Sequence, residues 1–132
     1  MVVQISDYDH DGGTNPWEYG FTNTISGAGL GPEGYTATLI NGKGRFWDKT
    51  LGRYNQAPLT VFTCASGDKY RFRVIHAGSQ FPHRVSIEGH SMTLVASDGG
   101  ELEPTPIESF IVNPGEGIDV EVTCDQPVGN YW

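Results

Sequence analysis

Glycine and proline interrupt this chain so often that long helices are excluded. Together they supply 26 of its 132 residues, 18 Gly and 8 Pro, and the longest stretch free of both is residues 1–11. Gly destabilises a helix interior through backbone entropy, and Pro does so because it lacks an N–H group. The spacing therefore predicts an all-β protein built from short strands and many turns.

Short segments of alternating apolar and polar residues lie between these breaks. The clearest is residues 118–124, where Ile118, Val120, Val122 and Cys124 share one face. Alternation of this kind is typical of a strand with one buried face. Further strands are expected over residues 2–6, 36–40, 59–64, 70–74, 84–88, 92–96 and 109–112. Eight or more short strands at this spacing predict a Greek-key β-sandwich or barrel.

Length and charge bound the kinds of partner. A chain of 132 residues supports one compact domain, and 37% apolar with 18% charged residues is typical of a folded chain. The formal net charge of −8 disfavours binding to nucleic acid or to an anionic membrane surface. No apolar run approaches the length of a membrane span.

Five sequence blocks carry a resemblance to a known family. They are ATLINGKGR at 37–45, YRFRVI at 70–75, VSIEGHSMTL at 85–94, NPGE at 113–116 and QPVGNYW at 126–132. In this order they resemble the second cupredoxin domain of laccase-type multicopper oxidases. The resemblance implies a cupredoxin-type Greek-key fold over residues 1–132, as one part of a three-domain chain.

The resemblance also implies a role. In such oxidases copper lies in the first and third domains, and the middle domain spaces them and forms part of the substrate cleft. The parent protein would oxidise phenols, aromatic amines or metal ions and reduce dioxygen to water. Its partners would be the flanking cupredoxin domains and a small-molecule substrate, and its location would be extracellular, as a secreted protein.

Copper ligands are missing from the sequence patterns of this segment. Copper sites of the family use His-x-His pairs and a Cys flanked by His, whereas the four histidines form no such pair and neither cysteine has a histidine within ten residues. We therefore expect no cofactor in this segment, with copper in the parent protein. The histidines are His10, His76, His83 and His90, and each is expected to be structural or solvent-facing.

The resemblance places substrate-cleft candidates in two segments. One precedes the ATLIN block and holds Glu33, Tyr35 and Thr36; the other precedes the SIEGH block and holds Gln80, Phe81 and His83. Many fungal laccases have a carboxylate at the position of Thr36. A threonine does not act as a general base at neutral pH, so Glu33 is the available substitute.

A calcium site is a second interpretation of the N-terminal region. Asp7, Asp9, Asp11, Asn15 and Glu18, with a glycine at the sixth position, match the oxygen-ligand spacing of a calcium loop. A strand rather than a helix precedes the loop and a proline interrupts it, so an acidic solvated loop is the alternative. The alternative function is a stand-alone, non-catalytic cupredoxin-like binding or matrix module, in which this loop would bind calcium or a mineral surface.

The two cysteines, Cys64 and Cys124, each share a strand face with apolar residues. They are either two buried thiols or one disulfide. The resemblance to a largely secreted family favours the disulfide, since secreted proteins fold in an oxidising environment.

Overall fold

The computed structural model describes residues 1–8, 37–78 and 81–132, and within these ranges it contains ten strands and no helix. The all-β prediction is therefore confirmed, and no helix in this part of the chain could cross a membrane. The strands are β1 (Val2–Tyr8), β2 (Ala37–Ile40), β3 (Trp47–Asp48), β4 (Arg53–Tyr54), β5 (Lys69–His76), β6 (His83–Val85), β7 (Met92–Ser97), β8 (Gly100–Ile107), β9 (Phe110–Val112) and β10 (Gly117–Thr123).

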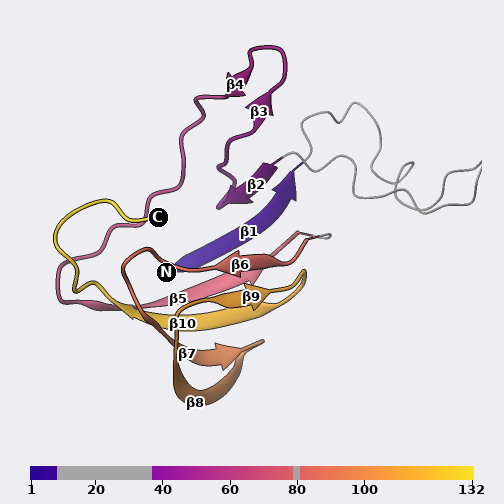
Figure 1. Cartoon of the computed structure of the whole chain (residues 1–132). Helices are drawn as coiled ribbons and strands as arrows, with labels where there is room; N and C mark the ends of the chain where they lie inside the picture. The colour runs from indigo at the N-terminus through magenta and orange to yellow at the C-terminus, as the bar shows by residue number, and fades with distance from the viewer. Residues whose placement is uncertain (9–36, 79–80) are drawn as a thin grey trace, which may run out of the picture.

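Six of the strands form one sheet in the order β2-β1-β5-β10-β7-β8 (Figure 1). Its pairings are antiparallel except that β1 runs parallel to β5, with Val3 opposite Val74 and Ile5 opposite His76. Two short ribbons complete the described structure, β6 with β9 and β3 with β4. The parallel pair matters for function because it brings the C-terminal ends of β1 and β5 to the same edge of the fold.

The core lies between the large sheet and the β6–β9 ribbon. Val112 of β9 is fully buried against Val3, Ile5 and Val74 of the sheet. A second cluster of Met92, Val120 and Val122 continues the core across β10 and β7. Alternate residues of β10 thus face the core, as the sequence pattern predicts.

Asp119 departs from that pattern, because alternation predicts an exposed side chain and the residue is only 5% exposed. Two arginines of the neighbouring strand β5 cover it. Arg71 Nε lies 2.8 Å and Arg73 Nη2 3.1 Å from Asp119 Oδ2. The hydrogen bonds from Arg73 and then Arg71 hold the pKa of the Asp119 carboxyl below its usual range, against the opposing effect of burial.

The interaction of Asp119 with its two arginines predicts a pH-dependent contribution to stability. A lowered pKa in the folded state stabilises the protein above the pKa of the unfolded chain, about 3.9, and the stabilisation is lost as the pH falls through the folded value. Asp119→Asn is expected to lower the free energy of unfolding at pH 7 by about 1–2 kcal/mol. The difference from wild type should shrink toward about pH 2, because the carboxyl is then protonated in both states.

Chemical denaturation at several pH values measures this effect. The control is Glu121→Gln, which removes a carboxylate from the same strand whose partner, Lys69, is largely exposed. That exposed pair should contribute less than about 1 kcal/mol. An equal loss of stability in both variants would contradict the role of Asp119.

The predicted strand over residues 59–64 is wrong. This segment has no ladder, and side-chain contacts hold it in place instead. The Thr60 hydroxyl donates to the Ile40 carbonyl, and the Phe62 ring packs edge-on against Phe72 with centroids 5.9 Å apart. Residues 61–64 are nevertheless all exposed, so the apolar pattern was incorrect about burial as well as about backbone pairing.

The predicted disulfide is confirmed. Cys64 and Cys124 are bonded with their Cα atoms 6.5 Å apart, and the bond joins residues 60 positions apart in sequence. Backbone hydrogen bonds flank it, from Gly67 N to Cys124 O and from Cys124 N to Asp68 O. The bond ties the irregular 59–64 segment to the end of β10.

Candidate functional site

Three of the predicted site residues lie in the described part of the chain. They are Phe81 and His83 of the cleft set and Asp7 of the calcium set. The remaining candidates lie outside the described residues, and for them the assignments stay predictions. These are Glu33, Tyr35, Thr36 and Gln80 for the cleft, and Asp9, Asp11, Asn15 and Glu18 for calcium.

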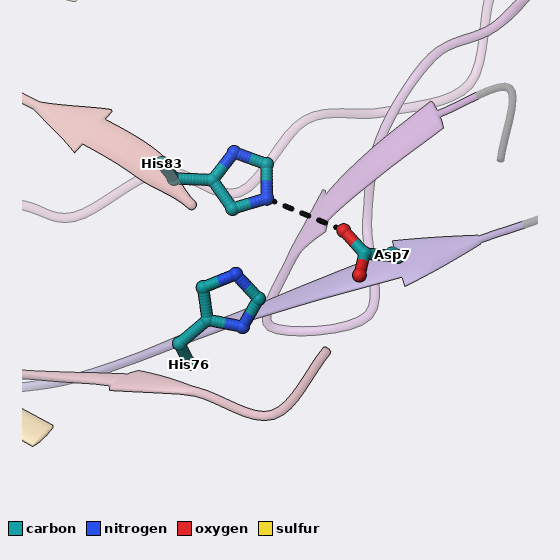
Figure 2. Close-up of side chains that lie close together, drawn as sticks. All are labelled: Asp7, His76 and His83. Carbon is teal, nitrogen blue, oxygen red and sulfur yellow. Dashed lines mark hydrogen bonds and ion pairs between the residues drawn. The ribbon is translucent and has the colours of Figure 1, made fainter. Parts of the chain in front are cut away.

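Two of the described candidates, Asp7 and His83, lie together with His76 in one polar cluster (Figure 2). Asp7 lies near the end of β1, His76 ends β5 and His83 begins β6. The parallel pairing of Ile5 with His76 places Asp7 near His76, and β6 then brings the second imidazole over the first. One nitrogen of each ring and one carboxylate oxygen all lie within 4.8 Å of one another.

His76 is a buried histidine, 1% exposed, with both ring nitrogens engaged. Nδ1 accepts a hydrogen bond from the Gly78 N–H at 3.0 Å, and Nε2 lies 2.6 Å from the Phe81 carbonyl oxygen. A carbonyl only accepts, so Nε2 carries the proton and Nδ1 does not. The two contacts together assign a neutral imidazole with its proton on Nε2.

His83 and Asp7 complete the cluster. His83 Nε2 lies 3.3 Å from Asp7 Oδ1, and their side chains are 20% and 3% exposed respectively. The His83 ring stacks on His76 with centroids 4.8 Å apart and 29° between the planes. Gly78 is required here, because a Cβ at that position would lie 2.5 Å from Asp7 Oδ2 and 2.6 Å from His76 Cε1.

The cluster contains ligand types that metals bind, but its geometry does not fit a copper ion. An imidazole binds metal through an unprotonated nitrogen, in the plane of the ring. His76 has no such nitrogen free, and two stacked rings do not direct their in-plane lone pairs at one point. The disulfide also leaves no thiolate in the chain, since Cys64 and Cys124 are its only cysteines.

The same contacts bear on the other metal prediction. The Asp7 carboxylate is nearly buried and lies against His83, so a calcium ion would have to compete with that contact. The other four candidate ligands are outside the described residues. The calcium site therefore stays a prediction without structural support.

Sequence reasoning did not find this cluster. It treats His76 and His83 as separate structural or solvent-facing residues, and Asp7 as part of an acidic loop. No sequence signal joins the three, because their proximity depends on the parallel β1–β5 pairing and on the path of the chain from β5 to β6. His83 belongs to the cleft candidates, and its environment is now defined by Asp7 and His76.

Comparison with known proteins identifies the class to which this fold belongs. A multicopper oxidase family model matches residues 1–132, the whole chain. The structure is similar to the crystal structure of laccase from Botrytis aclada, with a TM-score of 0.75 and 26% identity over 99% of this chain and 24% of that one. The chain belongs to the multicopper oxidase family, and its cupredoxin-type fold is confirmed.

Within the family, the sequence is similar to fungal laccases. It is 39% identical over 96 residues to Laccase-3 of Thanatephorus cucumeris, which covers 73% of this chain and 17% of that protein. It is 35% identical over 108 residues to the laccase of Pycnoporus cinnabarinus, which covers 80% of this chain and 20% of that protein. The chain thus corresponds to a laccase-like cupredoxin domain and spans only a small part of these relatives.

Proposed function

We propose that residues 1–132 form the copper-free middle domain of a laccase-like multicopper oxidase. The observation that carries the proposal is the mismatch between family and ligands. The whole chain matches a copper-oxidase family, yet its cysteines are joined in a disulfide and the one described His/Asp cluster has no coordinating nitrogen free on His76. A domain of this kind spaces the copper domains and contributes to the cleft wall.

The activity proposed for the whole protein is that of a laccase. Four one-electron oxidations of a phenol, an aromatic amine or a metal ion supply the four electrons that, with four protons, convert dioxygen to two water molecules. Copper in the flanking domains supplies the electron transfer and the dioxygen reduction. This chain contributes shape and support and takes no electrons itself.

We assign the cleft wall to the region around Phe81 and His83. The buried His76 of β5 binds the Phe81 carbonyl, and Asp7 of β1 contacts the His83 ring. Residues of β1 and β5 therefore fix the positions of Phe81 and His83. His83 keeps a partly exposed ring, while its partner Asp7 is nearly buried. Such support is what a rigid cleft wall requires, because a bound substrate is oriented only by side chains that are themselves held in place.

The disulfide also supports an extracellular location for the proposed protein, because such bonds persist in oxidising compartments. The partners that follow from the proposal are the flanking cupredoxin domains of the same polypeptide and a small-molecule substrate.

Copper titration tests the proposal. The 132-residue chain is expected to show neither the intense visible absorption of a copper–thiolate site nor oxidase activity after copper is added. The longer polypeptide that contains it should show both, and its additional sequence should contain His-x-His pairs and a Cys flanked by His. A copper–thiolate absorption band from the 132-residue chain alone would contradict the proposal.

A further inference from the structure

A short hairpin stands apart from the large sheet. Strands β3 and β4 pair only with each other, Trp47 opposite Tyr54 and Asp48 opposite Arg53, and the ribbon extends beyond β2 at one end of the molecule (Figure 1). We call residues 43–54 the basic hairpin, for the charges described below.

The tip of the basic hairpin is ordered by its own hydrogen bonds. Asp48 Oδ1 accepts from the backbone N–H groups of Thr50 and Leu51 at 2.9 and 3.0 Å. At its base, Asn55 N donates to the Phe46 carbonyl, and Phe46 N donates to Asn55 Oδ1. The hairpin therefore presents a defined surface to its surroundings.

That surface exposes large apolar side chains. Trp47 is 52% exposed, Leu51 60% and Tyr54 57%, and the two aromatic rings contact edge to face with centroids 5.3 Å apart. Trp and Tyr are among the residues that contribute most to protein interfaces. Apolar groups gathered on a projecting ribbon indicate a contact surface.

Its charge is opposite to that of the rest of the chain. Residues 43–54 hold four of the eight basic residues and only one of the sixteen acidic ones, so this segment has a net charge of +3 in a chain of net charge −8. The four cations are all exposed. They are Lys43, Arg45, Lys49 and Arg53. The hairpin is thus suited to an acidic protein surface with an apolar component.

The chain itself provides such a surface, at strand β8 and the residue after it. Residues 100–108 contain three exposed glutamates and no basic residue, and Leu102 is 43% exposed. Glu101 is ion-paired with Arg71 of the same chain at 3.1 Å, so Glu103 and Glu108 provide the charge available to a partner. β8 is the last strand of the sheet, and its Pro104 and Pro106 lack the N–H groups that would pair with an added strand. A partner therefore has to bind this acidic edge through side chains.

We propose that the basic hairpin of one copy of this chain docks on the acidic edge, residues 100–108, of a second copy. The two surfaces are at opposite ends of the molecule (Figure 1), so the contact is head to tail and extends to further copies instead of closing as a two-fold dimer. Opposite charges steer and align the contact, and Trp47, Leu51 and Leu102 supply the apolar surface that it buries.

Sedimentation velocity of the 132-residue chain tests the proposal. At low ionic strength and about 100 μM protein, the weight-average mass should exceed the 14.4 kDa of one copy and rise with concentration. It should return toward one copy in about 0.5 M salt, where the Debye length is roughly 4 Å. Trp47→Ser should weaken association at every salt concentration, because it removes apolar surface and no charge.

A charge exchange identifies the two surfaces. Lys49→Glu with Arg53→Glu reverses the hairpin, and Glu103→Lys with Glu108→Lys reverses the acidic edge. Each double variant alone should associate at least tenfold more weakly, whereas an equal mixture should regain association, because the basic hairpin of one variant meets the acidic edge of the other. Asp125→Lys, a charge reversal at an exposed residue outside both surfaces, is the control and should associate as wild type does.

The other outcomes overturn the proposal. A single-copy mass at every salt concentration, or a mixture that fails to recover, excludes docking between these surfaces. The same variants in the longer polypeptide show whether these surfaces bind a second copy or a neighbouring domain. If that polypeptide does not associate, neighbouring domains cover the surfaces. Binding of the hairpin to a sulfated polysaccharide with no self-association assigns it to a different partner. Melting curves of each variant show that a loss of association is not a loss of fold.

Discussion

Removal of the disulfide, by Cys64→Ala together with Cys124→Ala, is expected to lower the free energy of unfolding by about 4 kcal/mol. The bond closes a loop across a sequence separation of 60 residues, so it greatly restricts the unfolded chain. It also anchors the 59–64 segment, which has no strand partner of its own. Because a domain of this size is stable by about 5–15 kcal/mol, this loss is a large fraction of the total.

Urea denaturation at neutral pH measures this effect. The control is the wild-type chain with its disulfide reduced, which should lose a similar amount, since it keeps both side chains and lacks only the bond. The single variant Cys64→Ala should behave like the double variant. A change of less than about 1 kcal/mol in all three proteins would contradict a structural role for the bond.

Replacement of His76 by phenylalanine is expected to cost about 3 kcal/mol of folding stability. Phenylalanine keeps an aromatic ring at this position, but the Phe81 carbonyl and the Gly78 N–H each lose their hydrogen-bond partner on His76. Because His76 is only 1% exposed, water does not readily replace it. The effect should therefore exceed that of the same substitution at a histidine on the surface.

His90→Phe is the matched control. His90 bonds through Nδ1 to the Glu88 carbonyl and stacks edge-on against Tyr131, near the surface. Its replacement should change the free energy of unfolding by less than about 1 kcal/mol. Nitrogen NMR of the wild-type chain provides a second readout, since His76 should show a proton on Nε2 and none on Nδ1. Equal losses at the two histidines, or the opposite tautomer, would contradict the hydrogen-bond assignment.

The elements that sequence predicted well are those whose signal is local. β10 and β5 follow from strict alternation, because each buries one face against the core. Local residue types also explain two turns. Asn41–Gly42 and Asp98–Gly99 take positive φ values of 50° and 75°, and of 48° and 81°, a conformation that Asn, Asp and Gly tolerate best.

The misassigned elements depend on distant neighbours. Residues 59–64 contain the apolar residues expected of a strand, yet they are held by contacts with Ile40, Phe72 and Cys124, all outside the segment. Asp119 has the pattern of an exposed residue and is buried because two arginines of the adjacent strand cover it. In both cases the prediction from the local pattern was wrong, because the partner that decides the outcome lies on another element.

Sequence by itself determined the all-β class, the laccase-like family and the absence of copper-ligand motifs, because each of these depends only on residue types and on short spacings along the chain. The tertiary structure decided which distant residues meet. Asp7, His76 and His83 come together because β1 and β5 pair in parallel and β6 returns over them. The tautomer of His76, and with it the mismatch to a metal, follows from hydrogen bonds that exist only after the chain has folded.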